Sequence, residues 1–253
     1  MVMGVPTDDR HGPTPASKEA SPAPDFRELH VAPMLNYSSR EFRALFRILS
    51  RRAVLWTEMV VDETILHSPH LDEHLHLDAA AMNPVVVQLG GSRPDSMELA
   101  AAAAGARGYP EINLNADCPS KRVAGERLFG AALMKDAPRC AEVLRAMSAG
   151  APAGATVSVK CRVGVDDADS AEFAARFVAE ARPHCKRFYL HARRCVLDGT
   201  MSAHGNRSVP PLNYPRVYGL CRAFPDCEFV LNGGLRGLAE AAAVARGAGD
   251  GDG

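Results

Sequence analysis

The regular alternation of short β-rich runs with helical stretches is the feature that most constrains how this chain can fold. Seven runs rich in branched and aromatic residues occur, at 30–35, 54–60, 84–91, 111–118, 156–164, 187–194 and 228–234. Such alternation predicts a parallel sheet covered by helices. Only the connection 62–77 is unclear, because it is polar, His-rich and poorly periodic.

Helices between these runs are indicated by apolar spacing and by their end signals. The spacing is helical at Phe42, Leu45, Phe46 and Leu49, and again at Cys140, Val143, Leu144 and Met147. Asp136 and Asp169 are in positions to cap the starts of helices. Gly105, Gly108 and Gly150 mark the ends of helices.

Polar residues end most of the predicted strands, which favours one kind of sheet. They are Glu58, Gln88, Asn115, Lys160, His191 and Asn232. In a (β/α)₈ barrel these ends meet at one mouth. An open doubly wound sheet would gather polar ends at one switch point, and no GxGxxG follows the first run. We therefore predict an α/β TIM-type (β/α)₈ barrel, incomplete because only about seven strands are visible.

Charge and cysteine usage exclude several classes of protein. The 29 Lys and Arg residues nearly balance 30 Asp and Glu, so no global basic field marks a nucleic-acid partner, although a local patch remains possible. The 7 cysteines include no CxxC, which argues against zinc and disulfides and for a reducing compartment. No metal site is predicted, and surface positions are expected for His67, His70, His74 and His76.

The first residues differ in composition from the rest. Prolines and scattered charges dominate residues 1–28, so we expect a disordered leader there and a single catalytic domain over 29–253. The leader has no apolar core of a secretory signal, and no run is long enough to span a membrane. We expect the chain to be monomeric and cytoplasmic, and the composition of the leader does not exclude an organellar location.

Nine motifs in order resemble those of the tRNA-dihydrouridine synthases, closest to the bacterial A-type branch. They are APML, TEMV, VVVQLGGS, EINLNADCPS, LFGAALM, VKCRVGVDD, LHARR, NRSVPPLNYPRVYGL and LNGGL. The resemblance covers about residues 30–250. It implies FMN-dependent reduction of uridine to dihydrouridine in the tRNA D-loop, with NADPH as the reductant.

The resemblance also implies roles for individual residues. Cys118 matches the catalytic acid, and Asn115 matches a residue near the substrate base. The matches to FMN contacts are Pro33, Met34, Leu35, Gln88, Lys160 and His191, and those to the phosphate loop are Asn232, Gly233 and Gly234. Each has a plainer reading: Lys160 could pair with a carboxylate, His191 could be a satisfied loop histidine, and glycines also end strands.

The implied reaction explains why a cysteine would serve at position 118. Reducing the uracil C5–C6 bond needs a hydride at C6 from the flavin and a proton at C5 on the opposite face. A thiol with a pKa near 8.5 stays protonated at neutral pH and can donate that proton. The alternative is a buried small hydrophobe, which is common for cysteine.

Basic side chains near the predicted mouth are the candidates for tRNA contact. The resemblance and their loop positions suggest Lys121, Arg122, Arg127, Arg193, Arg194, His204 and Arg207. Each could equally be a solvated loop charge.

Two departures from the family pattern leave alternatives open. Asp117 stands where the family usually has glycine. The sequence ends about where an eighth strand and the helical tRNA-gripping domain would follow, so we expect the edges of strands one and seven to lie open. The alternatives are an inactive truncated paralogue or fragment with residual RNA binding, or another FMN barrel dehydrogenase.

Overall fold

The computed structural model describes residues 2–4, 28–77, 82–120 and 128–247, and it is an α/β barrel. Parallel strands run in the order of the chain, each with the next. They are β3 (Leu55–Val61), β4 (Val85–Gly90), β5 (Glu111–Ala116), β6 (Thr156–Arg162), β7 (Arg187–His191) and β8 (Glu228–Asn232). The predicted first strand is reduced to β2 (Leu29–His30), which reaches β3 through a parallel bridge between His30 and Val54.

The gap between the first and last of these strands is filled by a strand that the sequence did not predict. β1 (Val2–Gly4) pairs antiparallel with β2 on one side and with β8 on the other. The open edges expected for strands one and seven are therefore paired in the structure. β1 comes from the predicted leader, whose residues 1 and 5–27 lie outside the described residues. Three residues carry too little periodicity to reveal such a strand.

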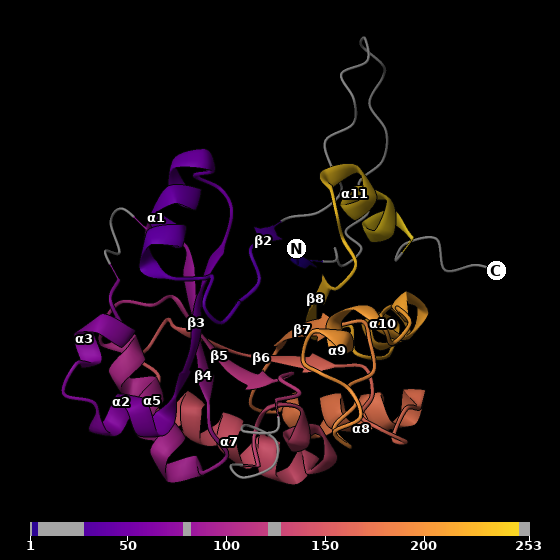
Figure 1. Cartoon of the computed structure of the whole chain (residues 1–253). Coiled ribbons are helices and arrows are strands. Elements are labelled where there is room, and N and C mark those ends of the chain that lie inside the picture. Colours follow the sequence, from indigo (N-terminus) through magenta and orange to yellow (C-terminus); the bar gives the residue numbers. More distant parts are fainter. Residues whose placement is uncertain (1, 5–27, 78–81, 121–127, 248–253) are drawn as a thin grey trace.

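Helices follow most of the strands and cover the outside of the sheet. They are α1 (Arg40–Leu49), α2 (Asp62–His67), α3 (Leu71–His74), α5 (Pro94–Gly105), α7 (Ala137–Gly150), α8 (Ala171–Ala181), α9 (Gly205–Ser208), α10 (Tyr214–Ala223) and α11 (Leu238–Arg246), with the 3₁₀ helix η1 (Gly130–Lys135). Helices α5, α7 and α8 lie side by side along one flank (Figure 1). The unclear connection 62–77 thus contains α2 and α3.

Of the two predicted helix caps, one is confirmed and one is wrong. Asp136 caps α7, its side chain accepting the N–H of Arg139 at 3.1 Å. Asp169 was predicted to cap the next helix, but Ser170 does so, accepting the N–H of Phe173 at 3.1 Å. The Asp169 carboxylate instead accepts a hydrogen bond from Arg216. A residue one position away offered an equally good capping oxygen, so the sequence did not discriminate.

Two apolar layers hold the barrel together. The larger lies between the sheet and the helices, and all six residues of β4 are buried. The smaller fills the barrel interior, where Trp56 packs edge-to-face on Tyr189 with ring centroids 4.7 Å apart. Trp56 also donates to Nδ1 of His30 at 3.2 Å, which satisfies its buried indole N–H. Within the described ranges, no helix combines the length and apolarity that crossing a membrane requires.

Candidate active site

Five of the predicted polar strand-end residues meet at the carboxyl ends of β4 to β8. Register pairs Asn115 of β5 with Lys160 of β6, and His191 of β7 with Asn232 of β8. These four residues and Gln88 are each less than a tenth exposed. Parallel pairing in register places their side chains next to one another, so the mouth predicted from the sequence exists.

A hydrogen-bonded chain of side chains runs through the barrel interior to this mouth. Asn115 Nδ2 donates to Gln88 Oε1 at 2.9 Å, and Gln88 Nε2 donates to Asn113 Oδ1 at 3.0 Å. Asn113 Nδ2 donates to Ser158 Oγ at 2.9 Å, and Ser158 donates to Glu111 Oε1 at 2.5 Å. Every donor in the chain points toward the Glu111 carboxylate. The bonds therefore polarise one another in a single direction, which strengthens them and fixes the Asn115 amide.

The loop after β5 is shaped by Asn115. Its Oδ1 accepts the backbone N–H of Asp117 at 3.1 Å and that of Cys118 at 3.0 Å. The Cys118 carbonyl in turn accepts the N–H of Ala131 at 3.1 Å. Cys118 is half-buried, and its sulfur is in the free thiol form. The loop therefore holds Cys118 at the mouth, where its half-buried side chain also packs against the apolar core.

Asp117 is the centre of an ionic cluster at the mouth. Its carboxylate accepts hydrogen bonds from Lys160 Nζ and from Arg162 Nε. His191 Nδ1 lies 3.5 Å from Asp117 Oδ1. The side chains of Lys160, Arg162 and His191 are 5, 1 and 7% exposed, against 15% for Asp117. Lys160 thus has a carboxylate partner, as its plainer interpretation proposed, and it also lies at the mouth.

Burial and charge shift the ionisation of this cluster. Burial raises the pKa of Cys118, and the Asp117 charge acts in the same direction. Burial would likewise raise the pKa of Asp117, but Lys160 and Arg162 outweigh it and hold that pKa well below its usual range. Burial lowers the pKa of His191 to about 4, although contact with Asp117 opposes the shift. At neutral pH the cluster therefore contains a thiol, a carboxylate and a neutral imidazole.

The predicted phosphate loop has the backbone that glycine permits. Gly233 and Gly234 have φ of 109° and 75°, in the left-handed region. A Cβ on Gly233 would lie 2.7 Å from His191 Cδ2, and one on Gly234 2.4 Å from Leu212 Cδ1. Tyr214 fixes the turn by donating to the Gly233 carbonyl at 2.8 Å. The two glycines therefore allow close packing directly beside His191.

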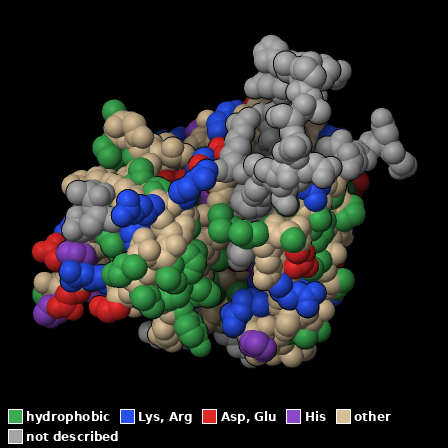
Figure 2. Space-filling view, turned by 90° about the horizontal axis from the view of Figure 1, so that it is seen from above, with side chains coloured by type: hydrophobic (Ala, Val, Ile, Leu, Met, Phe, Trp, Pro, Cys, Tyr) green, Lys and Arg blue, Asp and Glu red, His purple; other side chains and the backbone are tan. Residues whose placement is uncertain are grey.

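The predicted tRNA residues lie in different environments. Arg193 donates from Nη1 to the Pro210 carbonyl, while its Nε is buried without a partner. Arg194 donates to the Asp166 carbonyl at 3.3 Å, and its side chain is 40% exposed. His204 and Arg207 are exposed at α9. Lys121, Arg122 and Arg127 lie outside the described residues. On the face shown in Figure 2, Lys and Arg side chains form several separate groups, with acidic side chains beside some of them.

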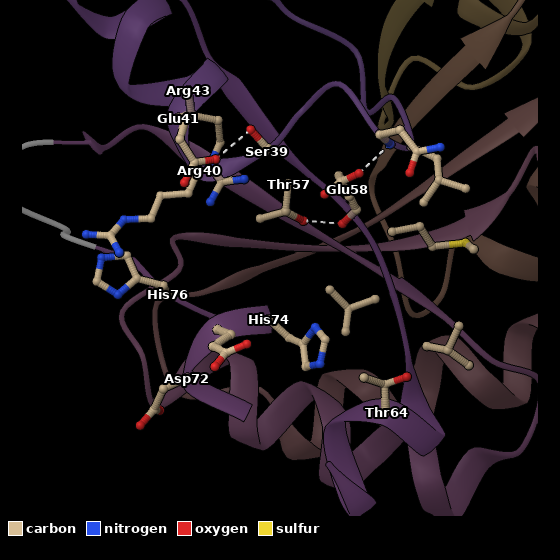
Figure 3. A pocket seen from close by; sticks show the side chains of 16 residues that line it. Ser39, Arg40, Glu41, Arg43, Thr57, Glu58, Thr64, Asp72, His74 and His76 are labelled. Carbon is tan, nitrogen blue, oxygen red and sulfur yellow. Dashed lines mark hydrogen bonds between the residues drawn. The ribbon is translucent and has the colours of Figure 1, made fainter. Parts of the chain in front are cut away.

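The loop after β2 borders a second hollow. Pro33 is half-buried, whereas Met34 and Leu35 are exposed. Leu35 lines a cavity of about 780 Å³ between this loop, β3 and the segment of α3. Arg40, Glu58 and His74 are among the side chains around it (Figure 3). The cavity lining includes both charge signs and none of Cys118, Lys160 and His191, so it is separate from the ionic cluster.

No metal-binding group emerges from the residues that the structure describes, in the sense of three or more His, Cys, Asp or Glu side chains that could hold an ion. His67 and His70 are exposed and lie beside the acidic residues Glu63 and Glu73, at 3.2 and 3.4 Å. His74 is also exposed and His76 half-buried.

The mouth suits an anionic, planar cofactor such as FMN. The orphaned, buried Nε of Arg193 is a donor without an acceptor, and phosphate would supply one. The buried ammonium of Lys160 and the amide of Gln88 are of the kind that bind the polar edge of a flavin ring. The donor chemistry of the chain therefore fits this cofactor.

Arg162 and Asn206 are site residues that sequence reasoning missed. Arg162 is 2% exposed and donates from Nη1 to the Asn206 carbonyl at 2.8 Å. Asn206 is fully buried and clamps the loop before α9, bonding both the N–H and the carbonyl of Val196. A signal for Arg162 was available: in β6 it follows Lys160 by two residues, and the period of a strand places both on one face.

Comparison with known proteins identifies a family and several close relatives. The family model for dihydrouridine synthase (Dus) matches residues 30–251. A tRNA-dihydrouridine(20/20a) synthase of Escherichia coli K12 is 41% identical over 243 residues, covering 92% of this chain and 68% of that protein. A tRNA-dihydrouridine(20/20a) synthase of Yersinia pestis is 43% identical over 230 residues, covering 90% of this chain and 64% of that protein.

A solved structure supports the fold alone. A crystal structure of a Burkholderia cenocepacia protein described as a lyase/mutase aligns with a TM-score of 0.54. It is 14% identical in sequence and covers 86% of this chain and 73% of its own. At that identity the likeness extends to the α/β barrel and no further.

Proposed function

Because this chain belongs to the dihydrouridine synthase family, we propose that it reduces uridine in tRNA to 5,6-dihydrouridine, with FMN as cofactor and NADPH as reductant. The observation that carries the proposal is the placement of Cys118. Asn115 holds the backbone of Cys118 at the mouth, next to Asp117 and its partners Lys160 and His191, and burial raises the pKa of the thiol. The relatives' names support uridines 20 and 20a, in the D-loop, as the substrate positions.

The chain's residues divide the chemistry between them. FMN, once reduced by NADPH, would supply the hydride to uracil C6. Cys118 donates its proton to C5 from the other face, and its raised pKa keeps that proton available at neutral pH. Lys160 would hold a positive charge beside the bound flavin and so stabilise its reduced, anionic form. Asn115 holds the acid in position through the Cys118 N–H.

Binding of the two large ligands falls to other residues of the mouth. We assign Gln88, Lys160, His191 and the loop Asn232–Gly234 to FMN. The family resemblance adds Pro33, Met34 and Leu35 on the loop after β2, where Leu35 also lines the separate cavity beside β3. For tRNA we propose Arg194, His204 and Arg207, because these side chains are exposed or partly exposed at the mouth. Arg193 is buried at Nε, so FMN phosphate suits it better than tRNA.

The test is direct detection of the product. The purified chain is incubated with FMN, NADPH and unmodified tRNA, and dihydrouridine is measured by mass spectrometry of the digested RNA. Cys118→Ala should lower the rate by about 10²–10⁴-fold, the usual contribution of a general acid, while flavin reduction by NADPH continues. Cys221→Ala, on α10, is the matched control and should keep the wild-type rate. Equal rates for Cys118→Ala and wild type would refute the assignment.

A further inference from the structure

The carboxylate of Asp117 joins three strand ends at the mouth. It follows β5, and it accepts hydrogen bonds from Lys160 and Arg162 of β6, with His191 of β7 at 3.5 Å. The four side chains are at least 85% buried, since none is more than 15% exposed. The Asp117 carboxylate supplies a counter-charge to two buried cations, which is needed because an uncompensated charge is costly in a low-dielectric site.

We propose that Asp117 is a positioning residue that acts as the shared counterion of Lys160 and Arg162 and thereby keeps the proton on the Cys118 thiol. The inference deepens the proposed function and rests on it for its role in catalysis. Glycine, the residue that the family resemblance leads one to expect at this position, could supply no charge. In this chain, the residue directly before the proposed acid Cys118 therefore carries a negative charge.

The charges around the thiol show why the carboxylate matters. Lys160 and Arg162 each contribute +1 and Asp117 contributes −1, so the three side chains sum to +1. His191 is neutral at pH 7, because its pKa is about 4. Among the described residues, the charged groups that act on the thiol are Asp117, Arg162 and Lys160, and the Cys195 thiol lies nearby. Without the carboxylate the sum becomes +2, and a thiolate would be favoured.

The experiment measures the thiol directly and needs neither flavin nor tRNA. The full chain is treated with iodoacetamide across a pH series, and alkylation at Cys118 is followed by peptide mass spectrometry. Asp117→Asn should alkylate several-fold faster at pH 8, because a fall of one unit in the thiol pKa raises the thiolate fraction about tenfold, while the weaker nucleophilicity of the less basic thiolate offsets part of that gain. Asp226→Asn is the matched control, since Asp226 also lies between two cations, Lys186 and Arg182, but near the amino end of β8.

A compensating variant separates charge from folding. Asp117→Asn/Lys160→Met removes one cation together with the carboxylate, so the sum returns to +1, and alkylation should return to within a few-fold of wild type. Half-buried Cys221 serves as an internal reporter, because local unfolding would also accelerate its alkylation. If Asp117→Asn unfolds, the alkylation rates of two other variants test the proposal. The double variant, which restores the charge sum, and Asp117→Glu, which keeps the negative charge, should both be alkylated slowly at Cys118.

The outcomes distinguish this inference from the proposed function. Unchanged alkylation in Asp117→Asn, or a double variant as fast as the single one, would overturn the counterion assignment. If the alkylation results hold but wild type forms no dihydrouridine, the proposed function fails and the counterion stands. If dihydrouridine forms and the thiol does not respond to Asp117, only the counterion assignment fails.

Discussion

The backbone N–H of Cys118 donates to Oδ1 of Asn115 at 3.0 Å, so a side chain at the end of strand β5 holds the cysteine in place. The same oxygen accepts the N–H of Asp117 at 3.1 Å. The amide nitrogen of Asn115 is committed to Gln88, and through it to the chain that ends at Glu111. The rigid interior of the barrel therefore sets where the proposed acid lies.

Removing the Asn115 amide should misplace the thiol without removing it. We expect Asn115→Ala to lower dihydrouridine formation about 10²-fold, since a shift of roughly 1 Å in a reacting group can cost that much. Asn115→Asp retains an acceptor for the two N–H groups and should lose less activity. Rates on saturating tRNA check this. Equal losses in the two variants would place the role of Asn115 in its donor group or in substrate contact.

The buried His191 should make the protein less stable as the solution becomes acidic. Its pKa is about 4 in the folded chain, against about 6.5 when unfolded. Between these values the unfolded state binds a proton that the folded state does not, so stability falls as pH drops from about 6.5 to 4. The slope is about 1.4 kcal/mol per pH unit, roughly 3 kcal/mol in total. Urea unfolding at pH 7, 6 and 5 measures it.

The control for this pH effect compares two histidines. His191→Asn should flatten the dependence over this range, whereas substitution of the exposed His204 by Asn should leave it as in wild type. A slope unchanged in His191→Asn would assign the effect to other groups. The Asp117 carboxylate titrates well below its usual range, so its own stabilising contribution is lost only at still lower pH.

Glu111 should contribute more to stability than any exposed ion pair of the chain. Its carboxylate is 7% exposed and accepts from Arg187 at 2.8 Å, Tyr189 at 2.8 Å and Ser158 at 2.5 Å. Glu111→Ala removes the acceptor of Tyr189 and Ser158 and one of the carboxylate partners of Arg187, and it should cost about 3–5 kcal/mol of unfolding free energy. Glu228→Ala is the control: Glu228 pairs with Arg187 too but is 43% exposed, so about 0–1 kcal/mol is expected. Chemical denaturation compares the two.

The salt dependence of tRNA binding should reveal which arginines meet phosphate. Arg207 is exposed at α9, on the loop that follows β7. If it neutralises one phosphate, Arg207→Ala should make the slope of log K against log salt shallower by about 0.7–0.9. Exposed Arg145 on the outer helix α7 is the matched control and should leave the slope unchanged. Fluorescence titration at several salt concentrations measures both. An identical slope for Arg207→Ala would remove that residue from the interface.

Strand faces and strand ends were readable from the sequence, because both depend on local pattern. Apolar runs closed by Gln88, Asn115, Lys160 and His191 predicted a mouth, and the structure places all four there. Helical spacing predicted α1 as well, yet Leu45 and Leu49 are exposed by 60 and 73%. Periodicity defines an apolar face, but it does not say whether another element covers that face.

Local pattern is thus enough to predict the order of the elements, the alternation that makes a parallel barrel, and the polar residues at the carboxyl ends of the strands. It does not predict that β1 fills the gap between β2 and β8, or that Asp117 bonds to Lys160 and Arg162. These contacts join residues that are far apart along the chain. The carboxylate is 43 and 45 residues from its two partners, so their meeting depends on the register of β5 with β6. Local propensity cannot encode that register; closure of the whole sheet sets it.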